Sequence, residues 1–384
     1  MEYVLDILLY LFVFVASATL IYYGMKFSGA KKKIGLLFVI LGILIPSILA
    51  GIRYNVGTDY ASYIKMLNNV EAGHKMYFRQ IEPLSTLIII LSAHLHSSFL
   101  MFFSFSLITN ACFYLAFWRY FDGNKTRTAI AFLIYLFILF PTTLNAVRSS
   151  VAVSIITLIL SLLIKNYSKK SIIESIVLLV IATLFHKSAI LILLFVPVVL
   201  LSKTHHNDKI KTKRIALWYF YALMSAIIPL IYIALKDILP LGDYSRYLTG
   251  IGEKFSIPLS NVLMSTPILF TIAYLYKNKP QTKDKNFDEL MYYTIFYVPL
   301  SIAVGWLTIA SGLSRLSFVL EPLIIIIMSQ LITLPRKTTK IWRISAIICV
   351  SVVVSLMFIR NLNWSKALPY RTIFQTEVSY ASEN

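Results

Sequence analysis

The feature that most constrains this sequence is a succession of apolar runs, most of them long enough to cross a lipid bilayer as a helix. About 20 helical residues cross the ~30 Å hydrocarbon core. Twelve runs approach that length, near residues 3–25, 34–51, 98–118, 128–144, 149–164, 171–185, 188–202, 215–235, 259–276, 290–310, 316–334 and 344–359. We therefore predict an all-α, polytopic integral membrane protein with about 12 transmembrane helices, forming one transmembrane helical domain over residues 1–384.

Composition agrees with that class and narrows the chemistry. Hydrophobic residues make up 58% of the chain and charged residues 14%, which is unlike an ordinary soluble domain. A net charge of +19 would suggest a nucleic-acid partner in a soluble protein, but Lys and Arg that flank membrane spans account for most of it here, so none is expected. Cys112 and Cys349 lie within apolar runs, and no cluster of Asp residues is typical of a cation site. We therefore expect no metal and no cofactor.

The basic residues between the runs predict the orientation. Most of the 36 Lys and Arg residues lie on alternate loops, including the clusters at 31–33, 203–214 and 277–285. The positive-inside rule makes that face cytoplasmic and puts both termini outside. This parity requires that residues 82–97 do not cross completely. The apolar stretch 83–96 has only about 14 residues, which favours a re-entrant or interfacial segment over the alternative of a short true span.

The predicted outer ends of the runs carry arginines beside small or polar residues, namely Arg53, Arg148, Arg246 and Arg315. A lysine suffices as a topological signal, whereas a guanidinium binds phosphate oxygens bidentately and keeps its charge. Arginines that converge on one outer cavity would need an anionic ligand, and a pyrophosphate is the obvious candidate. Each arginine taken separately is equally compatible with an interfacial anchor. The external loops 52–82 and 236–258 are predicted to contribute the site.

Several short motifs follow one another in a characteristic order along nearly the whole chain. They are Gly51-Ile52-Arg53-Tyr54 with Gly57-Thr58-Asp59-Tyr60 and Tyr63, then Glu82-Pro83, Asn145-Ala146-Val147-Arg148, Phe185-His186-Lys187-Ser188 and Ser314-Arg315. In this order they resemble the EpsG-like branch of the Wzy-type polysaccharide polymerases of bacterial envelopes, which make O-antigen, capsule or exopolysaccharide. One departure is Ser149, which stands where the pattern leads us to expect Gln.

The resemblance implies a metal-independent membrane glycosyltransferase in the bacterial cytoplasmic (inner) membrane, with its active site facing the periplasm or exterior. Its substrates would be an undecaprenyl-diphosphate-linked glycan donor and a similarly linked acceptor. Membrane lipids, a chain-length regulator (polysaccharide co-polymerase) and a flippase would be its partners. The leaving group of such a transfer is a diphosphate, whose developing charge arginines can stabilise.

The acceptor in this reaction is a sugar hydroxyl, which needs a general base. Asp59 is the first candidate because Gly57 and Thr58 allow a tight turn before it, and Glu82 and His186 are the rivals. Each also has a structural reading; Asp59, for example, would pair with Arg53 or cap the following helix. The residues predicted to contact sugars are Tyr54, Tyr60, Tyr63, Asn145 and Tyr247.

Three other functions share parts of this pattern. A lipid-linked oligosaccharide flippase also needs cationic residues, but it would place them along the middle of the spans and show internal repeats. An O-antigen ligase shares the donor chemistry and differs in its acceptor. An acyltransferase would need a catalytic His deep within a helix and a tunnel for the acyl donor, and the single candidate His186 is too little to indicate one.

Overall fold

The computed structural model describes residues 2–27, 29–74, 81–165, 168–190, 259–278, 314–334 and 338–375. Within these ranges the secondary structure is helical, and the only extended pairing there is an isolated antiparallel bridge between Arg53 and Thr372. The all-α prediction is therefore confirmed for this part of the chain. Contacts divide the protein into two compact units, Met1–Ile190 with Val354–Asn384, and Leu191–Val353.

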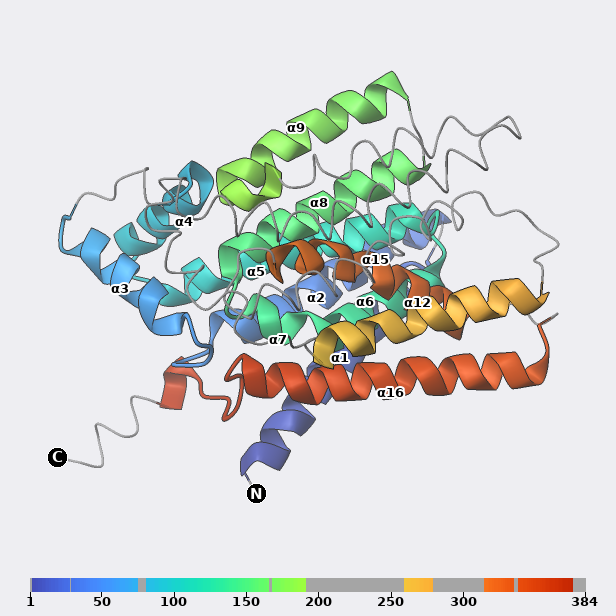
Figure 1. Ribbon diagram of the computed structural model, residues 1–384. Helices are drawn as coiled ribbons and strands as arrows, with labels where there is room; N and C mark the ends of the chain where they lie inside the picture. Colours follow the sequence, from blue (N-terminus) through green and yellow to red (C-terminus); the bar gives the residue numbers. More distant parts are fainter. Residues whose placement is uncertain are drawn as a thin grey trace, which may run out of the picture. The chain divides into compact units, whose positions relative to one another are not determined.

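The first unit holds the N-terminal helices and the end of the last one (Figure 1). Its elements are α1 (Glu2–Gly24), the short 3₁₀ helix η1 (Gly29–Lys31), α2 (Lys32–Gly51), α3 (Tyr60–Glu71), α4 (Pro83–His94), α5 (Ser98–Tyr120), α6 (Lys125–Ile138), α7 (Phe140–Thr143), α8 (Val147–Lys165) and α9 (Lys169–Phe185). The second unit includes α12 (Leu259–Asn278) and α15 (Ser314–Ile332), which pack together. The helix α16 (Lys340–Trp364) contributes its end, from Val354, to the first unit.

Among the described residues, 6 helices are long and apolar enough to cross a membrane: Tyr3–Gly24, Lys32–Gly51, Ser98–Tyr120, Val147–Lys165, Leu259–Lys277 and Lys340–Trp364. Each coincides with a run predicted from the sequence, which confirms the class of polytopic membrane protein. The predicted runs 215–235 and 290–310 lie outside the described residues, as does most of 188–202. Twelve spans, and termini on the outside, stay predictions.

The predicted run 128–144 differs from the structure, which divides it between α6 and α7. Pro141 causes the break, because proline has no backbone N–H to donate and its ring crowds the preceding turn. α6 therefore ends at Ile138, and the chain turns through α7 before α8 begins at Val147. This turn brings Leu144 and Asn145 into the site described below.

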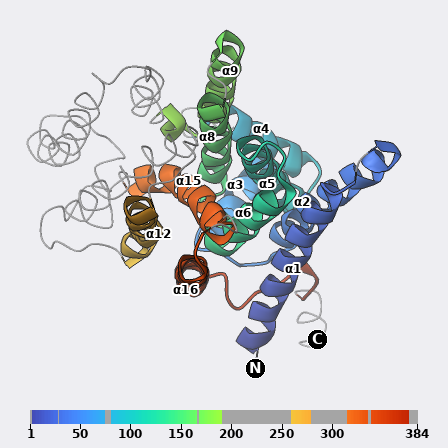
Figure 2. The same cartoon turned by 90° about the vertical axis from the view of Figure 1, so that its right-hand side faces the viewer.

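α8 is the most enclosed of the described candidate spans, because 89% of its apolar stretch is buried inside the protein. It packs against α5 and α9, while α2 packs against α1 and α5 (Figures 1 and 2). A polar contact crosses this apolar interior: the Asn110 amide donates to Ser47 Oγ at 2.9 Å and accepts from Tyr135 Oη at 2.6 Å. Buried polar side chains pair in this way because hydrocarbon offers them no partners.

α3 and α4 lie side by side and are both too short to span a bilayer. The buried face of α3 consists of Tyr60, Tyr63 and Leu67, at the spacing of a helix that is covered on one side. α4 has 12 residues, which gives a length of about 18 Å. This length is consistent with the interfacial or re-entrant segment predicted for residues 82–97.

Candidate functional site

Arg53 lies in the loop that follows α2, and its side chain is almost completely enclosed. The residue is 1% exposed. Its Nη1 donates to the Leu144 carbonyl at 2.5 Å, and its guanidinium carbon lies 4.2 Å from the centroid of the Phe102 ring. None of the ion pairs in the described part of the chain includes Arg53. The structure therefore holds this cation with a carbonyl and an aromatic face in place of a carboxylate.

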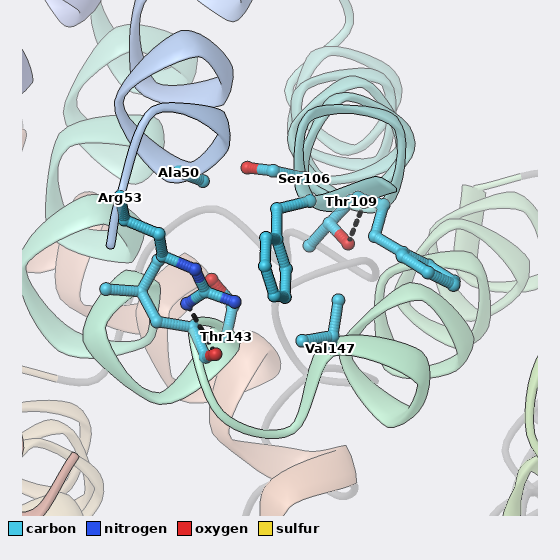
Figure 3. A pocket seen from close by; sticks show the side chains of 9 residues that line it. Ala50, Arg53, Ser106, Thr109, Thr143 and Val147 are labelled. Carbon is cyan, nitrogen blue, oxygen red and sulfur yellow. Dashed lines mark hydrogen bonds between the residues drawn. The ribbon is translucent and has the colours of Figure 1, made fainter. Parts of the chain in front are cut away.

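Burial affects the pKa of the Arg53 guanidinium. Desolvation lowers the pKa of Arg53 to about 10, against the opposing influence of nearby tyrosines, so the side chain stays charged at neutral pH. A small cavity of about 10 Å³ adjoins it (Figure 3). Ala50, Arg53, Phe102, Phe105, Ser106, Thr109, Thr143, Leu144 and Val147 line this cavity. It has room for about one water molecule.

The loop 52–59 needs glycine at position 57. Gly57 has a φ of +104°, and a Cβ there would lie 2.6 Å from Asn145 Oδ1. The same Asn145 oxygen accepts from the Thr58 backbone N–H at 2.8 Å. The loop therefore closes directly on the turn between α7 and α8, which places Asn145 beside Arg53 as a support for the loop.

The chain after α16 holds the other side of this loop. The Tyr54 N–H donates to the Arg371 carbonyl at 2.8 Å, and the Ile373 N–H donates to the Ile52 carbonyl at 2.9 Å. Tyr370 is buried, its N–H donates to Asp6 at 2.9 Å, and its hydroxyl donates to the Leu49 carbonyl. The C-terminal segment thus fixes the backbone on both sides of Arg53.

A second cluster of charged side chains centres on Glu82, the residue that precedes α4. Arg148 Nη1 lies 2.6 Å from Glu82 Oε2, and His186 Nδ1 lies 3.0 Å from Glu82 Oε1. The Lys187 backbone N–H donates to the same Oε1 at 3.0 Å. The side chains of Arg148, His186 and Glu82 are 20%, 14% and 7% exposed. One carboxylate therefore joins the beginnings of α4 and α8 to the end of α9.

This carboxylate is strongly biased toward its charged form. Burial alone raises the pKa of Glu82, but the hydrogen bonds from His186 and the Lys187 N–H, together with the Arg148 charge, lower it to about 2. An ionised carboxylate 3.0 Å from His186 Nδ1 favours a hydrogen on that nitrogen. Ser85 Oγ donates to the Phe185 carbonyl at 2.8 Å and ties α4 to the end of α9 beside the cluster.

Tyr63 connects the two clusters. Burial raises the pKa of the Tyr63 hydroxyl and the nearby Arg148 charge opposes this, while the Tyr63 ring packs edge-on against Phe102, with 6.1 Å between the ring centroids. The Tyr60 ring stacks on the same Phe102 ring, with 5.1 Å between the ring centroids. The structure therefore brings Arg53, Arg148, Glu82 and His186 together around the buried face of α3.

Two groups of predicted residues are placed differently from the rest. Asp59 is exposed; it accepts from Thr58 Oγ1 at 3.3 Å, and its side chain does not cap α3. Of the tyrosines predicted to contact sugars, Tyr60 and Tyr63 are buried in packing, while Tyr54 is 39% exposed. In this conformation Tyr54 is the one of the three that presents its ring to solvent.

Three predicted residues cannot be placed with these clusters. Arg246, Tyr247 and the loop 236–258 lie outside the described residues. Arg315 belongs to α15 in the other unit, and its side chain is likewise outside the description. The convergence of four arginines on one cavity therefore stays a prediction, and the structure brings together two of them.

The sequence did not single out Phe102, Leu144 or Tyr370 as parts of the site. Phe102 lies in an apolar run within a chain that is 14% aromatic, so nothing in the local pattern separates it from packing residues. Leu144 contributes its backbone carbonyl, which every residue has, so the residue type at position 144 does not indicate this contact. Tyr370 follows Pro369 in a short polar tail, where an aromatic residue beside proline was a weak signal of docking.

The described helices define a polytopic membrane protein, and enclosed charged side chains lie at or beside the ends of several of them. The sequence model of the EpsG family matches residues 36–372, a range that includes both clusters and the C-terminal segment. No curated protein and no solved structure matches the chain. The chain belongs to the EpsG family, a family of Wzy-like polysaccharide polymerases, as the motifs predicted.

Proposed function

We propose that this protein is a glycosyltransferase that polymerises undecaprenyl-diphosphate-linked oligosaccharide repeat units on the outer face of the bacterial cytoplasmic membrane. Family membership supports a polysaccharide polymerase in broad terms. The observation that carries the finer proposal is the largely enclosed cluster of Arg148, Glu82 and His186, which combines a guanidinium suited to phosphate with a histidine able to hold a proton. A flippase and a chain-length regulator would then be its partners in the membrane.

The helices themselves support the outer location. α2 runs from Lys32 toward Arg53, α8 runs from Arg148 to Lys165, and α9 runs from Lys169 toward His186. Each therefore has lysine at one end and a site residue at the other. Since lysines mark the cytoplasmic ends of spans, the site belongs at the opposite, outer ends.

Arg148 is the residue best placed to bind a diphosphate. Its side chain is partly exposed, and its charge is balanced by Glu82 until an anion arrives. A planar guanidinium can bind the carboxylate and a phosphate oxygen through different N–H groups. Arg53 is enclosed, so it would contact a diphosphate only after the loop 52–59 moves.

The purified protein in lipid nanodiscs, given diphosphate-linked repeat units alone, should make a ladder of longer lipid-linked glycans. Arg148→Lys should reduce the rate about 10²-fold or more, because lysine keeps the charge but loses the forked geometry at the leaving group. Arg119→Lys is the matched control. Arg119 lies at the C-terminal end of α5, its side chain is 44% exposed, and it pairs with Glu174 instead of Glu82. This variant should react at the wild-type rate.

Each other result of this assay has a definite meaning. No chain growth by the wild type would contradict polymerase activity. Transfer of glycan only when a lipid A core acceptor is added would identify a ligase instead. Movement of repeat units across the bilayer without new glycosidic bonds would identify a flippase.

The orientation is tested separately by labelling of cysteines in intact spheroplasts, in a background without Cys112 and Cys349. Ser62→Cys, on the exposed face of α3, should react with an impermeant thiol reagent. Lys170→Cys, at the start of α9 where Lys170 is 86% exposed, should react only after the membrane is permeabilised. The reverse pattern would place the site in the cytoplasm.

A further inference from the structure

We propose that His186 takes the proton of the acceptor sugar hydroxyl, and that Glu82 is a positioning residue for His186 and Arg148. This assignment rests on the proposed function, because it distributes roles within that reaction. It replaces Asp59 as the first candidate for the base. Three features of the structure support it: the donors that already occupy Glu82, the 3.0 Å contact between Glu82 and His186 Nδ1, and the helix ends that hold the pair.

Glu82 is poorly suited to take a proton itself. Its Oε1 accepts from the Lys187 N–H and lies 3.0 Å from His186 Nδ1, and its Oε2 accepts from Arg148 at 2.6 Å. A carboxylate with a pKa of about 2 is also a weak base at neutral pH. Both oxygens serve donors that would lose their partner if the carboxylate were protonated. Its geometry is that of a counterion that orients its neighbours.

The contact with Glu82 favours one nitrogen of His186 as the base. An ionised carboxylate, 3.0 Å from Nδ1, favours the tautomer with the hydrogen on that nitrogen. In the neutral imidazole the lone pair then lies on Nε2. When Nε2 takes a proton, the positive ring still faces the carboxylate, which stabilises it. A base oriented by a carboxylate in this way recurs among unrelated transferases and hydrolases.

The surrounding helices hold the pair in place before substrate binds. The His186 N–H donates to the Ala182 carbonyl at 2.9 Å and ends α9 at a defined position. Ser85 Oγ reaches the Phe185 carbonyl from α4, one residue before His186. Pro83, at the first position of α4, fixes the backbone after Glu82. A catalytic pair held by its own helix ends needs little reorganisation during the reaction.

Asp59 has none of these supports. It is exposed and accepts from the neutral Thr58 hydroxyl, and neither Arg53 nor Arg148 forms an ion pair with it within the described residues. Nothing in this arrangement orients its carboxylate toward a substrate. The clustered His186 is therefore the better base.

The proposed glycosyl transfer forms one bond at the anomeric carbon and breaks one. The acceptor hydroxyl oxygen forms a bond to the anomeric carbon of the donor sugar, and its proton passes to His186 Nε2. The bond between that carbon and the diphosphate oxygen breaks, and its electron pair leaves with the undecaprenyl diphosphate, whose charge Arg148 stabilises. The imidazolium later returns its proton to water.

The test compares three glutamine variants in single-turnover transfer, with purified protein and diphosphate-linked repeat units. His186→Gln should slow transfer about 10²–10⁴-fold, the usual loss of a positioned base. Glu82→Gln should lower the maximal rate of transfer, while the substrate concentration that gives half of this rate stays the same or falls, because Arg148 can still bind the diphosphate. His94→Gln, an exposed histidine at the end of α4, is the matched control and should keep the wild-type rate.

Chemical rescue separates chemistry from folding. Added imidazole should restore part of the rate of His186→Ala and none of the rate of Arg148→Ala, because a small base can replace the missing ring. Wild-type transfer by His186→Gln, or a slow His186→Ala that imidazole does not rescue, would overturn the assignment. Either result would leave the polymerase proposal intact, provided that the wild-type protein elongates glycan in the same assay.

Discussion

Glu82→Ala should destabilise the protein by about 3–5 kcal/mol and abolish polymer formation. Removing one partner of a buried ion pair leaves the other charge without compensation, and this is among the largest effects of a single substitution. Here two donors lose their partner, since both Arg148 and the Lys187 N–H bind this carboxylate. Thermal unfolding of the purified protein in detergent measures the loss.

Glu71→Ala is the control for this prediction. Glu71 also pairs with a histidine, His96 at 3.4 Å, but the His96 side chain is 80% exposed and the pair lies near solvent. Exposed pairs contribute about 0–1 kcal/mol, so this variant should unfold close to the wild-type temperature. Equal shifts in the two variants would mean that the Glu82 cluster has no special role in stability.

The same cluster predicts a dependence on acid. The pKa of Glu82 falls from 4.5 to about 2 in the folded protein, so its stabilising contribution is complete above about pH 4.5. That contribution should be lost as the pH falls toward 2, since protonation then removes the charge that holds Arg148 and His186. Glu82→Gln should lack this part of the acid dependence.

Arg53→Met should strongly slow polymer formation while leaving the protein at least as stable as the wild type. Arg53 is a buried cation that none of the ion pairs among the described residues includes. Methionine keeps the packing on Phe102 and removes the desolvated charge, and replacing buried charges with apolar residues is often neutral or stabilising by about 1–4 kcal/mol. Loss of one charge-stabilising group should slow transfer about 10²–10³-fold.

The measurements for Arg53→Met are thermal unfolding and glycan elongation on the same preparation. Val39→Met, at a buried position of α2 away from the two clusters, tests whether a buried methionine substitution affects activity by itself. An Arg53→Met protein that unfolds far below the wild-type temperature would show that the cation supports the fold. Full activity in that variant would remove Arg53 from the site.

Much of the architecture could be predicted because membrane spans are local features. An uninterrupted apolar run of sufficient length forms a helix in lipid whatever its neighbours are, since only a helix satisfies its own backbone groups there. The spans at Lys32–Gly51 and Val147–Lys165 were therefore predicted almost to their ends. The break at Pro141 was readable in principle, although the apolar run that continues through it obscured the division.

The candidate site was predictable only in part. Arg53, Glu82, Arg148 and His186 could be singled out because charged residues at the ends of apolar runs are costly and need a reason. Their partners could not, since a hydrogen bond such as the one from the Lys187 N–H to Glu82 joins residues 105 positions apart. The preference for Asp59 rested on the turn at Gly57 and Thr58. Such a turn shows which backbone conformations the loop can adopt, but it does not show which residues the Asp59 side chain will face.

By itself, the sequence determined that this is a helical membrane protein of the EpsG family, where its long spans lie and which charged residues stand at their ends. Only the tertiary structure decided that Glu82 pairs with Arg148 and His186, and that Arg53 is enclosed beneath the C-terminal segment. The reason is physical. Span formation depends on the free energy of transferring one continuous segment into lipid, whereas the pairing of helix ends depends on how several separate helices pack together.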